Sequence, residues 1–241
     1  MFLFYHDVID NELLTLSPEE SRHCVKALRH KNGDLIQVTD GYGHLVTGEI
    51  LDAHLQKCLI RIIERHLNPQ RSLFLHIAVA PTKNVDRMEW LLEKAIEMGV
   101  EKISFIQCDH SERVHVDLNR MHRIAVSAMK QSQTTRIPEM ELISLLQFFS
   151  QYGEENCDKL IAWCDADTQS QLINYKINTD KIILLIGPEG DFSPREIEIA
   201  FQKGFESVKL GNRRLRTETA ALYGCAVLAA KELNVERKNN L

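Results

Sequence analysis

Two stretches near the C-terminus decide the expected fold of this 241-residue chain: Ile186-Gly-Pro-Glu-Gly-Asp-Phe-Ser193 and Leu210-Gly-Asn-Arg-Arg-Leu-Arg-Thr-Glu-Thr-Ala220. Each follows an apolar, strand-like run that breaks at a glycine, and each leads into a predicted helix. The first run, Lys181 to Ile186, has the continuous apolar character of a parallel strand buried on both faces. Because ligands of open α/β sheets bind beyond the carboxyl ends of strands, the two turns are expected to form one ligand site.

The first turn has the residue types of an abrupt strand-to-helix connection. Gly187 removes a side chain where the chain must turn, Pro188 fixes φ, and Gly190 permits a positive φ or a close backbone approach. Ser193 is the predicted N-cap of a helix over residues 195–203. A tight loop that binds no ligand would use the same residue types, so this segment alone leaves both interpretations open.

The second turn is strongly basic. Within eight residues it carries four cations and no acid: Lys209, Arg213, Arg214 and Arg216. A solvated basic turn is the alternative, but the position next to a glycine at a strand end favours a role facing an anion. Thr217 is the predicted N-cap of a helix to about Leu233. That helix is apolar nearly all round, as expected of one buried in a core or a subunit interface.

Taken together, Ile-Gly-Pro-Glu-Gly and Leu-Gly-x-Arg-x-Leu-Arg-x-Glu-Thr-Ala resemble the SPOUT superfamily of knotted methyltransferases. Within it, the pattern is similar to the ribosomal RNA small subunit methyltransferase E family. Further stretches resemble the same family: Glu93 to Val100, Lys130 to Ser132 with Arg136 to Pro138, and His23 to Arg29. The resemblance therefore covers nearly the whole chain.

Three positions depart from the family pattern. Asp191 stands where a second glycine is usual, and it either alters the loop or caps the following helix. Thr134 stands where the family has an arginine, and Arg136 follows two residues later. Met98 replaces a common leucine, which nearly conserves volume.

The resemblance implies an α/β protein with two domains. Residues 1–70 are expected to form a small PUA-like β-barrel that binds RNA. Residues 72–241 are expected to form a SPOUT-type α/β domain with a C-terminal trefoil knot, which is a rare exception to ordinary chain topology. The local patterns agree, because short strand signals fill the first part and strands alternate with helices from Ser72 onward.

The same resemblance implies an S-adenosylmethionine-dependent enzyme that methylates N3 of one uridine in the decoding region of 16S ribosomal RNA. The implied partners are this RNA, within the assembled small subunit, and a second copy of the chain in a homodimer. Neither a metal nor a membrane is implied. The expected cofactor contacts come from both turns: Ile186, Gly187, Pro188, Glu189, Gly190, Leu210, Gly211, Asn212 and Leu215.

Methylation at N3 requires that the uracil proton leave, with help from a base or from a cation that stabilises the developing anion. Arg216 follows the basic turn and matches the family's arginine, so it is the candidate cation. Glu218 is a candidate base, and its alternative role is that of a first-turn acid favoured by the helix dipole. Glu189 is expected to orient its loop.

The net charge of −5 excludes a globally basic nucleic-acid binder, so RNA contacts need local patches. Arg22, Lys26 and Arg29 recur at helical spacing on a helix predicted to open at Ser17, and they are expected to bind RNA. Arg136 is a further RNA-binding candidate. The stretch before it is rich in cations: Arg113, Arg120, Arg123 and Lys130. Solvated helix faces are the alternative in both places.

Other functions stay open at this stage. A catalytically silent RNA-binding dimer would keep the same fold, and Asp191 supports that idea. A SPOUT methyltransferase acting on a different RNA nucleotide is also compatible. A phosphate-binding nucleotide enzyme is disfavoured, because neither Gly-x-x-x-x-Gly-Lys-[Ser/Thr] nor Gly-x-Gly-x-x-Gly occurs. The six cysteines form no Cys-x-x-Cys pair, and no signal peptide is evident, so a cytoplasmic chain with reduced thiols is expected.

Overall fold

A computed structural model describes residues 2–112, 115–163 and 170–239. The chain divides into two compact units. Unit 1 consists of Met1–Gln70 and Val126–Ile137, and unit 2 consists of Arg71–Ala125 and Pro138–Leu241. Each unit therefore contains two separate stretches of the chain.

Unit 1 is built on a five-stranded sheet with the order β1-β3-β4-β5-β2. Its strands are β1 (Leu3–Tyr5), β2 (Leu13–Thr15), β3 (Leu35–Thr39), β4 (His44–Asp52) and β5 (Leu59–Leu67). β1 pairs with β3 in parallel, and the other pairs are antiparallel. Alternate residues of β4 are buried, so one face packs on a core that includes Phe4, Ile36 and Ile60.

The helix of unit 1 changes type along its length. Ser17 accepts a hydrogen bond from the Glu20 amide (3.2 Å), and α1 (Pro18–Arg22) follows as expected. The chain then forms a π-helical turn, His23–Ala27, instead of continuing as an α-helix. The helical segment is over by Arg29, whose φ of 61° lies in the left-handed region. The prediction of one regular helix to Arg29 is therefore wrong in its second half.

The segment 126–137 belongs to unit 1 through hydrogen bonds to the turn that follows β3. The Gly43 amide donates to the Thr135 carbonyl (2.9 Å), and the Ile137 amide donates to Gly41 (3.0 Å). Arg136 donates to the carbonyls of Tyr42 (2.6 Å) and Asn68 (2.7 Å). These contacts satisfy main-chain groups that a turn would otherwise leave to solvent.

Unit 2 contains a six-stranded, wholly parallel sheet with the order β11-β9-β10-β6-β7-β8. Its strands are β6 (Phe74–Val79), β7 (Lys102–Gln107), β8 (Glu139–Ser144), β9 (Asp158–Ile161), β10 (Lys181–Ile186) and β11 (Glu206–Ser207). Five of the six residues of β10 are buried, which confirms the prediction of a central strand covered on both faces.

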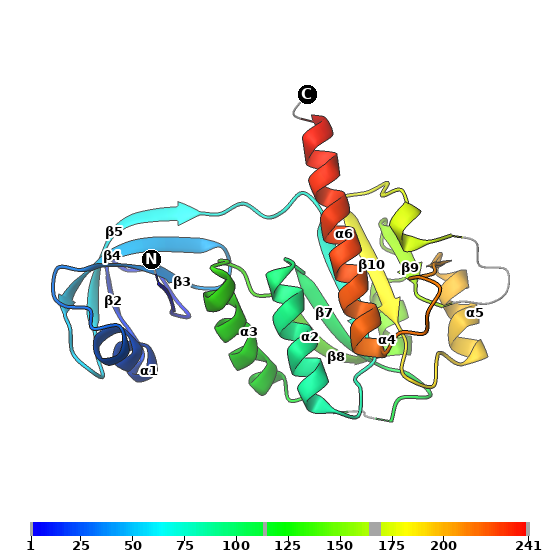
Figure 1. Cartoon of the computed structure of the whole chain (residues 1–241), viewed down its shortest axis with the longest axis horizontal. Helices are drawn as coiled ribbons and strands as arrows, with labels where there is room; N and C mark the ends of the chain where they lie inside the picture. Colours follow the sequence, from blue (N-terminus) through cyan, green and yellow to red (C-terminus); the bar gives the residue numbers. More distant parts are fainter. Residues whose placement is uncertain (1, 113–114, 164–169, 240–241) are drawn as a thin grey trace. The chain divides into compact units, whose positions relative to one another are not determined.

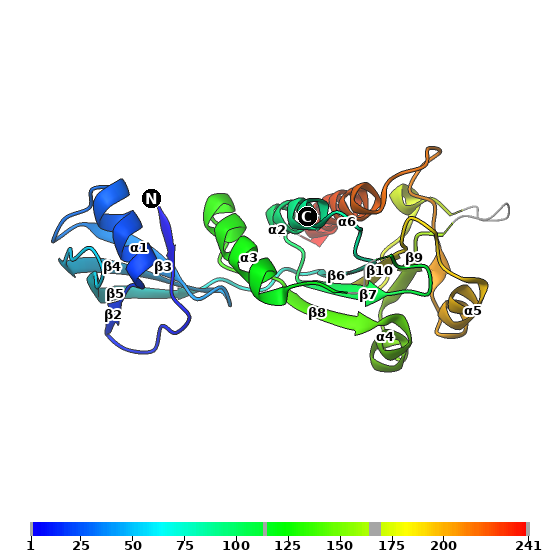
Figure 2. The same ribbon diagram turned by 90° about the horizontal axis from the view of Figure 1, so that it is seen from below.

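Helices cover both faces of this sheet, as Figures 1 and 2 show. α2 (Val85–Glu97) and α6 (Thr217–Asn239) lie on one face, and α4 (Leu145–Tyr152) and α5 (Pro194–Gln202) lie on the other. A short 3₁₀ turn, Leu172–Asn174, precedes β10, and α3 (Leu118–Ser132) begins in unit 2 and ends in unit 1. The expected α/β architecture is confirmed.

The start of unit 2 is locked to its helices by Arg71. Its guanidinium donates to the carbonyls of Met98 (2.8 Å) and Gly99 (2.6 Å), just beyond the end of α2. It also pairs with the carboxylate of Glu232 on α6, which is 3% exposed. The Arg71 side chain thus connects the segment before β6 to the end of α2 and to α6.

A buried polar chain crosses three neighbouring strands of unit 2. Ser104 on β7 donates to Glu141 on β8 (2.6 Å), so its oxygen is free to accept a hydrogen bond from His76 Nε2 on β6 (2.7 Å). His76 is fully buried. Burial, and after it the charges of Lys102 and Lys181, lower the pKa of His76 to about 3. The folded protein therefore holds this imidazole neutral.

Because the folded pKa of His76 lies below its ordinary value, the unfolded chain binds this proton first as the pH falls. We expect the His76 contribution to unfolding free energy to fall by about 1 kcal/mol from about pH 7 to about pH 5.5. The pKa of Glu101 is raised to about 7 by burial, and its contribution has the opposite sign in the same range. The test therefore compares the change in unfolding free energy between these two pH values in wild type with the same change in His76→Leu.

Urea unfolding followed by tryptophan fluorescence reports on unit 2, because Trp90 and Trp163 are the only tryptophans and both lie there. His76→Leu should lose less stability on acidification than wild type does. Equal losses in the two proteins would show that His76 does not titrate on unfolding.

Candidate functional site

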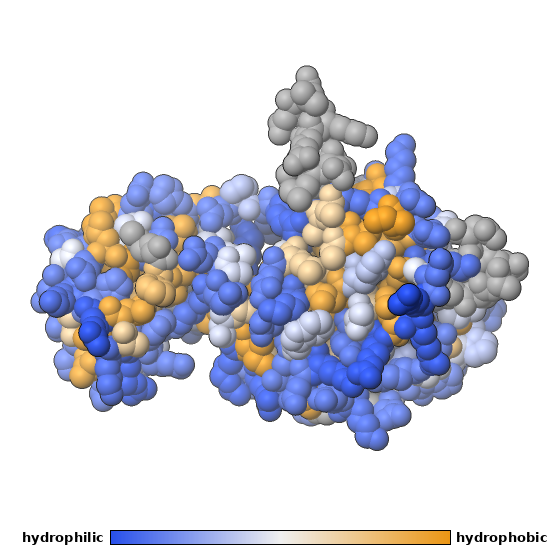
Figure 3. All heavy atoms as spheres, viewed as in Figure 1, coloured by the Kyte–Doolittle hydropathy of each residue, from blue (hydrophilic) through white to orange (hydrophobic). Residues whose placement is uncertain are grey.

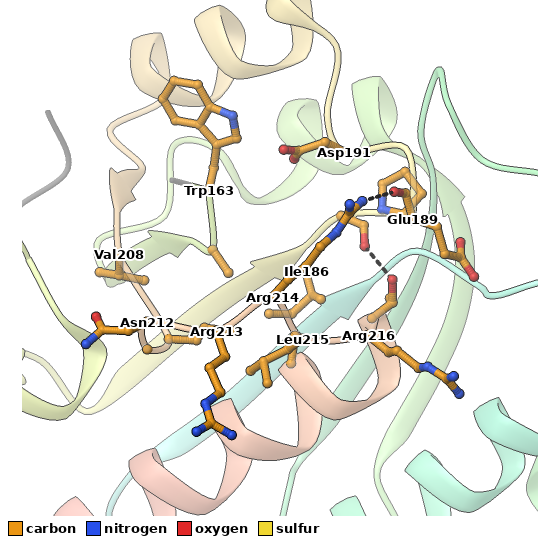
Figure 4. A pocket seen from close by; sticks show the side chains of 17 residues that line it. Trp163, Ile186, Glu189, Asp191, Val208, Asn212, Arg213, Arg214, Leu215 and Arg216 are labelled. Carbon is orange, nitrogen blue, oxygen red and sulfur yellow. Dashed lines mark hydrogen bonds between the residues drawn. The ribbon is translucent and has the colours of Figure 1, made fainter. Parts of the chain in front are cut away.

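The two glycine-containing turns meet in the structure, as their sequences predicted. The Thr217 hydroxyl donates to the carbonyl of Gly187 (3.1 Å), and Arg214 reaches the carbonyl of Glu189 (3.4 Å; Figure 4). Thr217 is not the N-cap that was predicted, because it is already the first residue of α6 and the Ala220 amide donates to the Arg216 carbonyl (2.8 Å). Its hydroxyl joins the loops instead.

A cavity of about 620 Å³ lies between the two turns. Eight of the nine residues predicted to bind the cofactor line it: Ile186, Gly187, Pro188, Glu189, Leu210, Gly211, Asn212 and Leu215. The ninth, Gly190, does not line the cavity. The turns and the strand ends of β9 and β10 therefore form one site.

The two glycines of the first turn are explained by close approach. A Cβ atom on Gly187 would lie 3.0 Å from the ring of Phe192. A Cβ atom on Gly190 would lie 3.1 Å from the Cβ of His110. Neither has a positive φ, so of the two reasons considered for Gly190, close packing applies.

Asp191, which departs from the expected glycine of the motif, adopts a left-handed backbone conformation. Its φ is 64°, in the left-handed region that aspartate tolerates better than most residues. Its carboxylate accepts a hydrogen bond from the Phe192 amide (2.8 Å). The following helix is capped by Ser193 and Glu196 in a reciprocal capping box. Asp191 therefore stabilises the loop and does not cap the helix.

Some main-chain polar groups around the cavity have no partner among the residues that the structure describes. From Leu210 to Leu215, no amide or carbonyl makes a hydrogen bond to another described residue. The amides of Glu189 and Gly190 likewise have no acceptor in the described part of the chain. Such groups require partners when they are covered, so a ligand in the cavity can supply them.

The structure separates the two candidate catalytic residues. Arg216 lines the cavity, is exposed, and makes no side-chain hydrogen bond or ion pair with the residues that the structure describes. Glu218 does not line the cavity. It is 6% exposed and pairs with Arg87 on α2 (3.4 Å). The geometry thus supports the helix-start role for Glu218 more than the role of a base.

Sequence reasoning missed one large side chain of the site, Trp163. It follows β9, lines the cavity and packs against the ring of Phe201 (centroids 5.9 Å apart). Ala162, Val208, Asp191 and the neighbouring Ala220 also line it. Applying the strand-end rule to β9 as well as to β10 would have pointed to Trp163.

Three of the four RNA-binding candidates are available for contacts. Arg22, Lys26 and Arg29 are exposed, and none forms an ion pair with a described residue. Arg136 is different, because its guanidinium already serves two carbonyls within unit 1.

The cations before Arg136 are also partly neutralised. Arg120 pairs with Glu89 (2.6 Å), and Lys130 pairs with Glu20. Arg113 lies outside the described residues. This stretch is therefore less positive than its composition indicated.

In residues 2–112, 115–163 and 170–239, no group of three His, Cys, Asp or Glu side chains is arranged to hold a metal ion. Within the same ranges, no helix has the length and apolar character needed to cross a membrane.

The chain is similar to known RNA methyltransferases. A family model described as RNA methyltransferase domain matches residues 69–229, and one described as RNA methyltransferase PUA domain matches residues 16–63. A probable rRNA-methyltransferase from Porphyromonas gingivalis has a crystal structure similar to this chain. It is 36% identical, has a TM-score of 0.87, and the match covers 98% of this chain and 100% of that one.

Two further relatives are informative. A methyltransferase from Legionella pneumophila, solved in complex with S-adenosylmethionine, is 30% identical with a TM-score of 0.80, over 95% of this chain and 97% of that one. The ribosomal RNA small subunit methyltransferase E of Mesomycoplasma hyopneumoniae is 30% identical, over 83% of this chain and 86% of its own length. With the matched models and the shared fold, these similarities show that the chain belongs to the ribosomal RNA small subunit methyltransferase E family of RNA methyltransferases.

Proposed function

We propose that this protein transfers a methyl group from S-adenosylmethionine to N3 of a uridine in the decoding region of 16S ribosomal RNA, within the assembled small subunit. The observation that carries the proposal is the cavity between the two turns, where the main-chain groups of Leu210 to Leu215 make no hydrogen bond to another described residue. The resemblance to SPOUT proteins implies that these two turns, which the Thr217–Gly187 hydrogen bond joins, belong to a trefoil knot. A cytoplasmic location follows from the ribosomal substrate.

The cavity suits the cofactor in size and in chemistry. Its volume of about 620 Å³ falls within the usual range of small-molecule sites. The amides and carbonyls of Leu210 to Leu215, which have no partner in the described part of the chain, offer donors and acceptors to the polar groups of S-adenosylmethionine. Ile186 and Leu215 offer apolar contacts. When bound, the cofactor supplies an electrophilic methyl group.

The first test concerns cofactor binding. Gly187→Val should weaken S-adenosylmethionine binding at least about tenfold, because any side chain at this position crowds Phe192 and displaces the loop. Titration calorimetry measures the affinity, and circular dichroism checks that the variant is folded. Absence of saturable heat with the wild-type protein would contradict the cofactor assignment.

Arg216 is the residue proposed to act on the reacting base. Arg216 lines the cavity, and its guanidinium has no partner among the described residues, so it is available to a uracil that loses its N3 proton. A cation next to the reacting base stabilises that developing negative charge. Glu218, held by Arg87, contributes to the start of α6.

Arg216→Ala should therefore lower the single-turnover methylation rate roughly 10²-fold at saturating RNA and cofactor. Glu218→Gln should lower it far less, because its carboxylate does not line the cavity. The reaction uses isolated small subunits, and mass spectrometry of the digested RNA identifies the methylated nucleoside and its position. A wild-type rate for Arg216→Ala would remove this residue from the chemistry.

A matched control removes positive charge elsewhere. The double variant Lys26→Ala/Arg29→Ala lies in unit 1, where these cations are proposed to contact phosphates. It should weaken RNA binding and reduce the slope of log affinity against log salt by roughly 1.5. Its methylation rate at saturating RNA should stay near wild type.

The wild-type reaction distinguishes the alternative functions. Methylation of another nucleotide by the wild-type protein would favour a different RNA substrate, and no methylation at all would favour the catalytically silent RNA-binding dimer.

A homodimer is proposed from the uncovered face of α6. Tyr223, Ala226 and Ala230 are exposed on this helix, and Trp90 on the adjacent α2 is 44% exposed. Figure 3 shows apolar residues gathered over α6 and beside it. A second copy would remove this surface from water, and two-fold pairing of one patch is the commonest way to do so.

Light scattering should therefore give twice the chain mass of 27.7 kDa. Ala226→Arg should give a folded monomer, because it places an unpaired charge in the interface. A wild-type protein that stays monomeric at all concentrations would refute the dimer.

A further inference from the structure

The first cavity loop is held by a complete set of hydrogen bonds to its carbonyl oxygens. Each carbonyl from Ile186 to Asp191 accepts at least one. The Ala80 amide donates to Ile186, the Thr217 hydroxyl to Gly187, the Asp191 amide to Pro188, and the Arg214 guanidinium to Glu189. His110 Nδ1 donates to both Gly190 (3.1 Å) and Asp191 (3.0 Å). His110 is thus the donor that serves two consecutive carbonyls.

His110 comes from a different part of unit 2, the loop that follows β7. Its neighbour Asp109 anchors this loop to the start of α5. The Asp109 carboxylate accepts from the Ser193 hydroxyl (2.6 Å), and the Asp109 amide donates to Glu196 (2.8 Å). Because both partners of His110 Nδ1 are carbonyl oxygens, this nitrogen carries the proton and donates.

These contacts decide the orientation of two peptide units. In a trans peptide the C=O and N–H groups point in opposite directions. Holding the Gly190 carbonyl therefore directs the Asp191 amide away from His110, and this amide closes a turn on the Pro188 carbonyl (3.0 Å). The absence of a side chain on Gly190 lets His110 approach closely.

We propose that His110 is a positioning residue for cofactor binding: it holds the turn 188–191 in the shape that presents to the ligand the Glu189 amide, which has no acceptor among the described residues. The proposal rests on the proposed function, in which the cavity binds S-adenosylmethionine. His110 does not line the cavity, so it acts through the loop and not on the cofactor. A loop that is already ordered loses less conformational entropy on binding.

Three substitutions distinguish the effect of the hydrogen-bond donor at position 110 from the effect of the side chain's shape. In His110→Asn, the amide nitrogen can take the place of Nδ1 and still donate. In His110→Asp, the side chain has the same shape as asparagine, but its carboxylate can only accept hydrogen bonds and cannot donate to the two carbonyl oxygens. His110→Ala removes the contact. Calorimetric affinity for S-adenosylmethionine should be near wild type for Asn, about tenfold weaker for Ala, and weaker still for Asp.

His66→Ala is the matched control, because His66 is an exposed histidine on β5 in unit 1. It should bind S-adenosylmethionine like wild type. Melting temperatures of all variants should agree without ligand, since position 110 is exposed. Equal affinities for wild type, Ala and Asp would overturn the role of His110.

Amide hydrogen exchange of the ligand-free protein tests the loop directly. The Asp191 amide should exchange faster in the Ala and Asp variants than in wild type, and the Asn variant should restore its protection. Unchanged exchange in all variants would overturn the inference. If exchange responds as expected but wild type binds no S-adenosylmethionine, the positioning of the loop stands and the proposed cofactor fails.

Discussion

The hydrogen bond from the Thr217 hydroxyl to the Gly187 carbonyl joins the two turns on which the site depends. Gly187 follows β10 at the centre of the parallel sheet, and Thr217 begins α6, which covers one face of that sheet. The contact therefore ties the carboxyl end of a buried strand to the start of a packed helix. With both loops held by rigid elements, the cavity between them can exist before any ligand arrives.

Buried polar contacts add to apolar packing in holding these elements together. Arg71 joins the start of unit 2 to α2 and to the buried carboxylate of Glu232. Asp158, at the start of β9, accepts hydrogen bonds from the amides of Asn178 and Thr179 and from the Tyr175 hydroxyl. Groups of this kind lose water on burial, so each partner is required and the segments are held in one arrangement.

Charge in this protein is organised locally. The net charge is −5, yet the cavity carries Arg213, Arg214 and Arg216, and the helical segment of unit 1 carries a separate group of exposed cations. Other cations that are close in the sequence, such as Lys130 and Arg120, are paired with carboxylates. Cations without a carboxylate partner attract phosphates more strongly than paired ones, so these two groups are surfaces suited to RNA.

The sequence by itself determined the elements whose signals are local: the buried strand β10, the cap at Ser193, the two glycine turns and the apolar helix α6. Weaker local signals were missed. β2 has three residues, β8 alternates polar and apolar residues at a sheet edge, and α4 spans eight residues. The tertiary structure alone decided which side chains stay available. In the fold, Arg136 donates hydrogen bonds to main-chain carbonyls, Glu218 pairs with Arg87, and His110 contacts the cavity loop. Local sequence patterns could not reveal these contacts, because each joins residues far apart in the chain.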